Sequence, residues 1–304
     1  MERLSSTGRR PGASSRSRRG ALPTFFIIGA PKAGTTSLYH YLECHPEIQM
    51  SAVKEPSYFA PTLDTLEVKL HVGSLQRYEQ LFDPDVAVRG EASTNYAEYP
   101  FREGVPEAIA ELVPEAKFIY LVRDPVERTV SHFRHIVANG SERRSLTQAL
   151  SDLEDPRSPW ICASLYALQL ELYLRIFPAE RMLVVDQADL LSDRSSTLRE
   201  IFAFLDVDEG FQSEQFEDEL LKGSEHRSYP LGLARFIEHQ VRPRSAWISP
   251  ATRRLLRRYV EVALPRLQTE SLDEQLRASL QQFYAGEVAH LRSLTGKTFP
   301  TWSV

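Results

Sequence analysis

Cysteine is scarce in this chain of 304 residues, which has only Cys44 and Cys162. The two are far apart in the sequence and form no C-x-x-C pair. This scarcity argues against a disulfide framework and against a structural zinc site, and it is typical of a reducing compartment. We therefore expect a cytoplasmic protein.

Long apolar runs and an excess of basic charge are also missing. No apolar run approaches the roughly 18 residues that cross a bilayer, so we expect no membrane span. The net charge is −5, which does not favour a nucleic-acid partner. The hydrophobic content of 42% is ordinary for a globular protein.

The amino-terminal segment differs in composition from the rest of the chain. Its first 20 residues hold six arginines and almost no apolar side chains. Such a segment buries too little surface to offset its ordering entropy, so we expect residues 1–22 to form a disordered Arg/Ser-rich tail. Residues 23–304 contain no repeat and no long linker, and we expect them to form one domain.

Short apolar runs alternate with helical periodicity after this tail. We expect strands at residues 25–30, 86–92, 117–125 and 182–186. We expect helices at residues 36–42, 125–137, 161–177, 198–204, 253–264 and 276–294. Strands that are separated by helices pair in parallel through crossovers. The fold class is therefore α/β, a three-layer sandwich with a central parallel sheet.

The stretch GAPKAGTTS (residues 29–37) directly follows the first expected strand. Its glycines are spaced as in the phosphate-binding loop G-x-x-x-x-G-K-S/T, but the lysine after the second glycine is missing. Lys32 stands in mid-loop instead. A strand, a glycine turn and a helix start place backbone N–H groups and the positive end of a helix dipole around an anion. The candidate phosphate-binding residues are Lys32, Ala33, Gly34, Thr35, Thr36 and Ser37.

Residues 31–38, PKAGTTSL, resemble the P-K-x-G-T-T-S/A-L loop of sulfotransferases that use 3′-phosphoadenylyl sulfate (PAPS). The resemblance implies a P-loop type of nucleotide-binding fold and places Lys32 near the oxygen that bridges phosphate and sulfate. A sulfuryl group carries less charge than a phosphoryl group. A lysine and backbone donors can therefore stabilise the departing phosphate, and we expect no metal.

A second stretch, residues 118–133, carries the resemblance further. In the family, an arginine at a strand end and a serine one short helix later bind the 3′-phosphate of the donor; here they are Arg123 and Ser131. A basic loop over the nucleotide corresponds loosely to residues 222–230, with Lys222 and Arg227 as candidates. The resemblance covers most of residues 23–302, and includes bacterial sulfotransferase-domain proteins and the heparan sulfate (glycosaminoglycan) sulfotransferases.

A hydroxyl acceptor needs a base as its oxygen attacks sulfur. Sulfotransferases that resemble the heparan sulfate enzymes supply a glutamate in a stretch such as E-K-S/T-x-x-Y, and residues 91–96 give Glu91 that role. Ala92 departs from the family pattern, which often has a lysine there. His135 stands where some members carry a catalytic histidine, and Lys54 lies in a KEP segment common in bacterial members.

These residues predict sulfuryl transfer from PAPS to a hydroxyl of an acceptor, a carbohydrate or a secondary metabolite, with release of adenosine 3′,5′-bisphosphate. The acceptor would be a small molecule or an oligosaccharide; the sequence does not determine the oligomeric state. One alternative is a P-loop nucleotide kinase, because residues 182–186, MLVVD, resemble a Walker B strand. The other is a non-catalytic nucleotide-binding module on the same fold.

Overall fold

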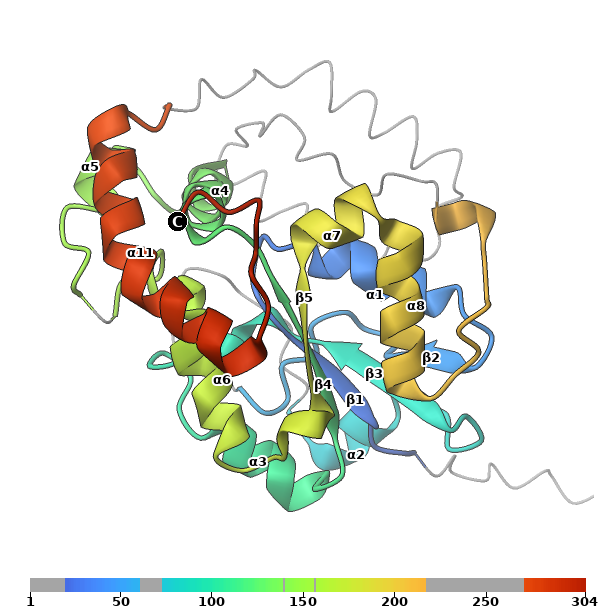
Figure 1. The fold of residues 1–304 in the computed structure, drawn as a ribbon. Coiled ribbons are helices and arrows are strands. Elements are labelled where there is room, and N and C mark those ends of the chain that lie inside the picture. Colours follow the sequence, from blue (N-terminus) through green and yellow to red (C-terminus); the bar gives the residue numbers. More distant parts are fainter. Residues whose placement is uncertain (1–19, 61–72, 139, 156, 217–270) are drawn as a thin grey trace, which may run out of the picture.

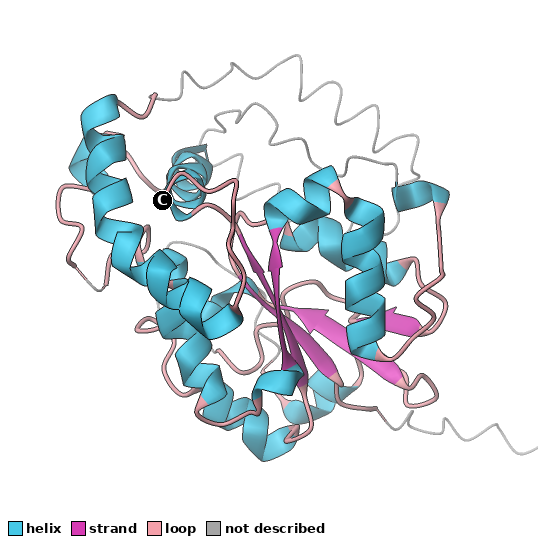
Figure 2. Cartoon of the chain, viewed as in Figure 1, coloured by secondary structure: helices cyan, strands magenta, loops and turns pink. Residues whose placement is uncertain are grey.

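Five parallel strands form the centre of the molecule (Figures 1 and 2). The structure is a computed structural model that describes residues 20–60, 73–138, 140–155, 157–216 and 271–304. The strand order is β2-β3-β1-β4-β5, and every neighbouring pair is parallel. The strands are β1 (Phe25–Gly29), β2 (Ile48–Met50), β3 (Val88–Ala92), β4 (Lys117–Val122) and β5 (Met182–Asp186).

Helices cover both faces of this sheet. The α-helices are α1 (Thr35–Glu43), α2 (Leu75–Glu79), α3 (Val105–Leu112), α4 (Pro125–Ala138), α5 (Leu146–Ala149), α6 (Tyr166–Leu174), α7 (Gln187–Ser192), α8 (Arg194–Leu205) and α11 (Glu274–Thr295). Short 3-10 turns include η1 (Thr94–Ala97) and η2 (Cys162–Ser164). In Figure 1, α3, α6 and α11 lie on one side of the sheet and α1, α7 and α8 on the other. The expected three-layer α/β sandwich with a central parallel sheet is confirmed.

The register of the strands decides which loops meet. Phe26 of β1 is opposite Glu91 of β3 and Phe118 of β4. Because helices cover both faces, the inner strands are buried almost throughout, and the rings of Phe26 and Phe118 stack at 5.6 Å. The carboxyl ends of β1, β3, β4 and β5 therefore lie along one edge, where ligands bind in open α/β sheets.

The expected elements differ from the observed ones in several places. The strand expected at 117–125 ends at Val122, and the helix expected at 161–177 is two elements, η2 and α6, interrupted at Leu165. β2, α2 and α3 were not expected, because they are too short to show a clear period. The helix expected at 253–264 lies outside the described residues.

The amino-terminal boundary also differs from the expectation. Ala21 donates its N–H to the carbonyl of Glu79 at 3.1 Å, and the carbonyl of Leu22 accepts from Arg89 Nε at 2.8 Å. Both side chains are partly buried against the core. Residues 20–22 therefore belong to the packed part of the chain, and residues 1–19 lie outside the described residues.

Candidate active site

The loop between β1 and α1 has the backbone geometry of an anion cradle. Lys32 and Gly34 both have positive φ, 70° and 97°. A side chain at position 34 would be strained by that φ, and its Cβ would come within 3.3 Å of Gln187 Nε2. The positive φ therefore favours glycine at position 34, whereas the end of the Gln187 side chain could shift to make room for a Cβ.

The N-cap position of α1 is a glycine, which provides no side-chain cap for the helix. Its N-cap is Gly34, its first turn contains no acidic residue, and its first helical hydrogen bond runs from Leu38 N–H to Gly34 O at 3.1 Å. The N–H groups of the first turn of a helix have no carbonyl within the helix to bind. Together with the positive end of the helix dipole, they favour an anion at this position.

Arg123 follows β4 and contacts this loop. Its Nη1 donates to the carbonyl of Lys32 at 3.3 Å, although the two residues are 91 positions apart. The carbonyl of Arg123 in turn accepts from the Tyr166 hydroxyl at 2.8 Å. Burial lowers the pKa of the Arg123 guanidinium, but an arginine stays charged in proteins. The structure thus brings two of the candidate donor-binding residues together.

Two further candidates, Ser131 and His135, lie one turn apart on α4, and both are partly buried. Arg128 fixes this helix against its neighbours. Its fully buried guanidinium donates to Ser164 Oγ and to the Trp160 carbonyl. Lys222 and Arg227, the candidates for a basic loop over the nucleotide, lie outside the described residues.

Glu91 is fully buried near the end of β3. Neither of its carboxylate oxygens has a hydrogen bond of normal geometry. Burial raises its pKa to about 8, while the nearby hydroxyls of Tyr96 and Tyr78 act in the opposite direction. A solvent-exposed loop glutamate is therefore excluded. A glutamate with its ordinary pKa would be ionised at neutral pH, and burial shifts this one toward the protonated form.

The sequence did not point to Tyr78 as a neighbour of Glu91, because it lies on α2, which was not expected. Its hydroxyl is buried and has no hydrogen-bond partner of normal geometry among the described residues. Tyr96, by contrast, accepts from the N–H of Phe59 at 3.3 Å. Nothing in the sequence around Tyr78 distinguishes it from an ordinary core tyrosine.

The segment that contains Lys54 lies along the end of β3. Glu55 donates its N–H to the carbonyl of Ala92 at 3.0 Å, and Ser57 donates its N–H to Ser93 Oγ at 3.1 Å. The ammonium of Lys54 pairs with the Glu55 carboxylate at 2.9 Å. Lys54 thus lies near the carboxyl edge of the sheet in an ion pair with its own neighbour in the sequence.

Asp186, at the end of β5, uses both of its carboxylate oxygens. Oδ1 accepts from the N–H of Ala188 at 3.1 Å and caps α7, and Oδ2 accepts from the indole N–H of Trp302 at 3.0 Å. Burial raises its pKa, and both hydrogen bonds oppose this rise. A Walker B aspartate must be available to magnesium, so these two contacts disfavour that role.

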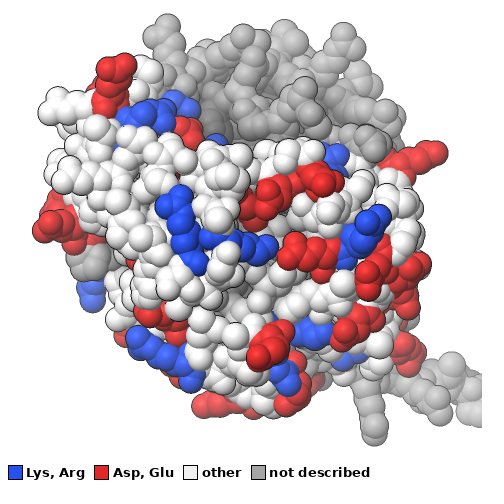
Figure 3. Space-filling model, viewed as in Figure 1, with Lys and Arg blue, Asp and Glu red and all other residues white. Residues whose placement is uncertain are grey.

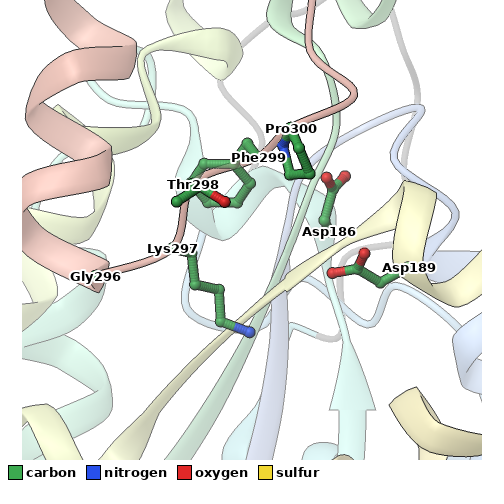
Figure 4. Close-up of a pocket in the computed structure, with 7 residues that line it drawn as sticks. All are labelled: Asp186, Asp189, Gly296, Lys297, Thr298, Phe299 and Pro300. Carbon is green, nitrogen blue, oxygen red and sulfur yellow. The ribbon is translucent and has the colours of Figure 1, made fainter.

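A pocket of about 370 Å³ lies beside Asp186 (Figure 4). It is lined by Asp186, Asp189, Gly296, Lys297, Thr298, Phe299 and Pro300. The ammonium of Lys297 pairs with the Glu200 carboxylate at 3.4 Å. Two carboxylates make this pocket unfavourable for an anionic donor, and none of the candidate donor-binding residues lines it.

Surface charge, metal-binding groups, apolar helices and cysteines bear on the kinds of site that the described residues can form. Acidic and basic side chains are interspersed over the face in Figure 3. Among the described residues, no group of three or more histidines, cysteines, aspartates and glutamates could hold a metal ion. In the same part of the chain, no helix has the length and apolarity to cross a membrane. Cys44 and Cys162 are both free thiols.

The fold and the loop define an α/β protein with a glycine-containing strand-to-helix loop at the carboxyl edge of its sheet. A family model described as "Sulfotransferase family" matches residues 23–212, and the chain belongs to this family. The expected relationship to the sulfotransferases is confirmed.

Two curated relatives and one solved structure illustrate the similarity. Carbohydrate sulfotransferase 15 of Mus musculus is 27% identical and the match covers 61% of this chain and 44% of that protein. Bifunctional heparan sulfate N-deacetylase/N-sulfotransferase 3 of Homo sapiens is 30% identical, with 61% and 22% covered. A crystal structure of a sulfotransferase from Alicyclobacillus acidocaldarius is 25% identical, has a TM-score of 0.68, and matches 93% of this chain and 100% of that one. The chain spans less than half the length of these curated relatives.

Proposed function

We propose that this chain transfers a sulfuryl group from PAPS to a hydroxyl of an acceptor and releases adenosine 3′,5′-bisphosphate. The observation that carries this proposal is the geometry of the loop between β1 and α1. The loop leads into a helix start whose N-cap, Gly34, has no side-chain cap, and Arg123 donates a hydrogen bond to the loop at the Lys32 carbonyl. Membership of the sulfotransferase family supports it. The names of the relatives favour a carbohydrate as acceptor, with a secondary metabolite as the other possibility.

The loop suits the phosphosulfate end of the donor. We assign the backbone N–H groups of residues 34–37 to its 5′-phosphate, because the start of α1 favours an anion and has no acidic residue in its first turn. The N–H of Ala33 donates to the Ala30 carbonyl at 3.1 Å and closes the loop. Lys32 would stabilise the negative charge that grows on that phosphate as it departs. Arg123 and Ser131 would hold the 3′-phosphate through charge-assisted and neutral hydrogen bonds. PAPS supplies the sulfuryl group and the phosphate leaving group.

Glu91 would take the proton from the acceptor hydroxyl. A carboxyl group with a pKa of about 8 is a stronger base than an exposed carboxylate. Only its ionised form can accept the proton, so activity should increase as the pH rises toward 8. His135 would act on the acceptor as a second polar group, from the last turn of α4.

The two alternatives have less support. A nucleotide kinase needs a magnesium site, and Asp186 already accepts hydrogen bonds from Ala188 and Trp302. A module that only binds nucleotide has no use for Glu91. A buried carboxyl group without hydrogen bonds costs about 1–3 kcal/mol, more if it is charged, and a catalytic role would account for its retention.

Thermal unfolding with two ligands tests the proposal. Adenosine 3′,5′-bisphosphate at about 100 times its Kd should add roughly 2.7 kcal/mol to the free energy of unfolding, whereas Mg-ATP should add much less. Stabilisation by Mg-ATP alone would favour the kinase. Labelled PAPS with a set of hydroxyl acceptors then tests transfer, and donor binding without transfer to any acceptor would favour the binding module.

A further inference from the structure

Three buried polar atoms without hydrogen-bond partners belong to two neighbouring side chains. They are both carboxylate oxygens of Glu91 and the hydroxyl of Tyr78, and both residues have no exposed surface. More than nine in ten buried polar groups in proteins have a partner. The Tyr78 hydroxyl and the Glu91 carboxyl lie close enough to influence each other's pKa, so each is the available hydrogen-bond partner of the other.

The ring of Tyr78 is held firmly by its aromatic neighbours. It stacks on Tyr58 with ring centroids 4.5 Å apart and an interplanar angle of 10°. Phe59 and Phe82 contact it edge to face, at 5.6 and 5.5 Å. Because these contacts fix the ring, its hydroxyl can change its hydrogen bonding without a movement of α2.

The Glu91 carboxylate raises the pKa of three buried tyrosines, each from a different element, and two of these tyrosines are engaged elsewhere. Tyr96 of η1 accepts from the Phe59 N–H, and Tyr173 of α6 donates to the Tyr96 carbonyl at 2.9 Å. Tyr78 of α2 has no other partner. Burial keeps the pKa of Tyr78 well above 10, so its hydroxyl retains its proton and can act as a donor.

We propose that Tyr78 is a positioning residue for Glu91, whose hydroxyl donates a hydrogen bond to the carboxylate and sets the pH range in which that carboxylate can act as a base. This inference rests on the proposed function. Glu91 accepts the proton of the acceptor hydroxyl, and Tyr78 keeps its own proton throughout. The hydrogen bond favours the ionised form of Glu91, which burial disfavours.

The substitution Tyr78→Phe tests this role because it keeps the ring and removes only the hydroxyl. A hydrogen bond to a charged group corresponds to a shift of about one pH unit or more. The acid limb of the kcat/KM profile should move up by that amount, so activity at pH 7 should fall about tenfold and recover at higher pH. Tyr58→Phe, which removes a hydroxyl from the stacked ring, should leave the profile unchanged. An unshifted limb in Tyr78→Phe, or equal loss at every pH, overturns the proposal.

A second measurement does not depend on activity. The Glu91 carboxyl carbon can be titrated by NMR in the full chain labelled with ¹³C-glutamate, with its signal assigned by its loss in Glu91→Gln. The midpoint should rise by about one unit or more in Tyr78→Phe. An unchanged midpoint contradicts the proposal. If the wild-type chain transfers no sulfuryl group and the midpoint still shifts, the proposed function has failed and the Glu91–Tyr78 pair stands.

Discussion

The carboxyl edge of the sheet has a closed half and an open half. In the closed half, after β4 and β5, Asp124 accepts from the N–H groups of Val126 and Glu127 at the start of α4 and from the N–H of Ser303. Asp186 similarly caps α7 and binds Trp302. Each carboxylate is used by two segments of the chain, so this half binds the carboxyl-terminal residues to the sheet.

In the open half, after β1 and β3, Glu91 differs from Asp124 and Asp186 because its carboxylate accepts no hydrogen bond from the described residues. α1 starts at Gly34 without a side-chain cap, and both oxygens of Glu91 lack a hydrogen bond. The two halves share one sheet and the same strand direction, so strand topology does not explain the difference. Hydrogen bonding within the chain therefore distinguishes the two halves: it satisfies Asp124 and Asp186, and it leaves Glu91 available for the role that we propose.

The largest expected effect is that of Glu91→Gln in the open half. The change keeps the shape and removes the proton acceptor, so kcat should fall roughly 10²- to 10⁴-fold. The affinity for adenosine 3′,5′-bisphosphate should stay within a few-fold. Steady-state kinetics and calorimetry measure the two quantities.

His135→Ala is the matched comparison for that experiment. It should act mainly through the KM of the acceptor, and its pH profile should keep an acid limb that reaches up to about pH 8, the pKa of Glu91. Loss of that limb in His135→Ala, together with an active Glu91→Gln, would reverse the two roles.

Lys32→Ala should lower kcat by roughly 10²-fold or more, comparable to the loss of one oxyanion donor. Arg123 binds the backbone carbonyl of Lys32, so this change removes the ammonium and keeps that contact. Lys297→Ala, in the acidic pocket, is the control and should keep the wild-type kcat. Turnover near wild type in Lys32→Ala would remove the lysine from the proposed mechanism.

Arg123 lies between the two halves, and its substitution distinguishes a role in ligand binding from a role in supporting the fold. If it holds the 3′-phosphate, Arg123→Ala should weaken adenosine 3′,5′-bisphosphate by roughly 10- to 150-fold, the value of one charge-assisted contact. AMP lacks that phosphate and should bind almost as before. Equal losses of the two ligands in calorimetry would mean that Arg123 only supports the Lys32 carbonyl.

The smallest expected effects concern stability, and here the two halves should respond in opposite directions. Asp186→Asn leaves one donor without its acceptor and should lower the free energy of unfolding by about 1–3 kcal/mol. Burial raises the pKa of Glu91 from 4.5 to about 8, so the wild type loses stability as the pH rises through this range. The glutamine in Glu91→Gln cannot ionise, so the free energy of unfolding of this variant should increase relative to that of the wild type as the pH rises from 4.5 to 8. Denaturant unfolding at pH 5 and pH 8.5 measures the stability of both variants. If Glu91→Gln becomes less stable relative to the wild type as the pH rises, the burial argument is contradicted.

Much of the open half was predictable because its parts are consecutive in the sequence. An apolar strand, two glycines and a helix start follow one another within residues 25–43, so local preferences are enough to predict the loop. Arg123 was predictable in the same way, since it directly follows an apolar strand. The roles of all the candidate site residues stay predictions, those of Lys32, Glu91 and Arg123 included, as do the single domain and the cytoplasmic location.

The environment of Glu91 was not predictable from its own neighbourhood. Its burial depends on α2 and on the segment around Phe59, which reach it only through the packing of the whole domain. Residues 182–186 resemble a Walker B strand in the sequence, and the contacts that disfavour this role likewise depend on a distant segment. Trp302, which binds Asp186, is 116 positions further along the chain.

The sequence by itself therefore determined the parallel α/β sheet, the glycine loop between its first strand and first helix, and the resemblance to the sulfotransferases. These follow from strand and helix periods and from the φ angles that glycine permits, which are local properties. Only the tertiary structure decided which carboxylates are satisfied. Desolvation and hydrogen bonding depend on which distant residues surround a group, so Asp186 became a structural cap and Glu91 a buried carboxyl with a raised pKa and Tyr78 as its neighbour.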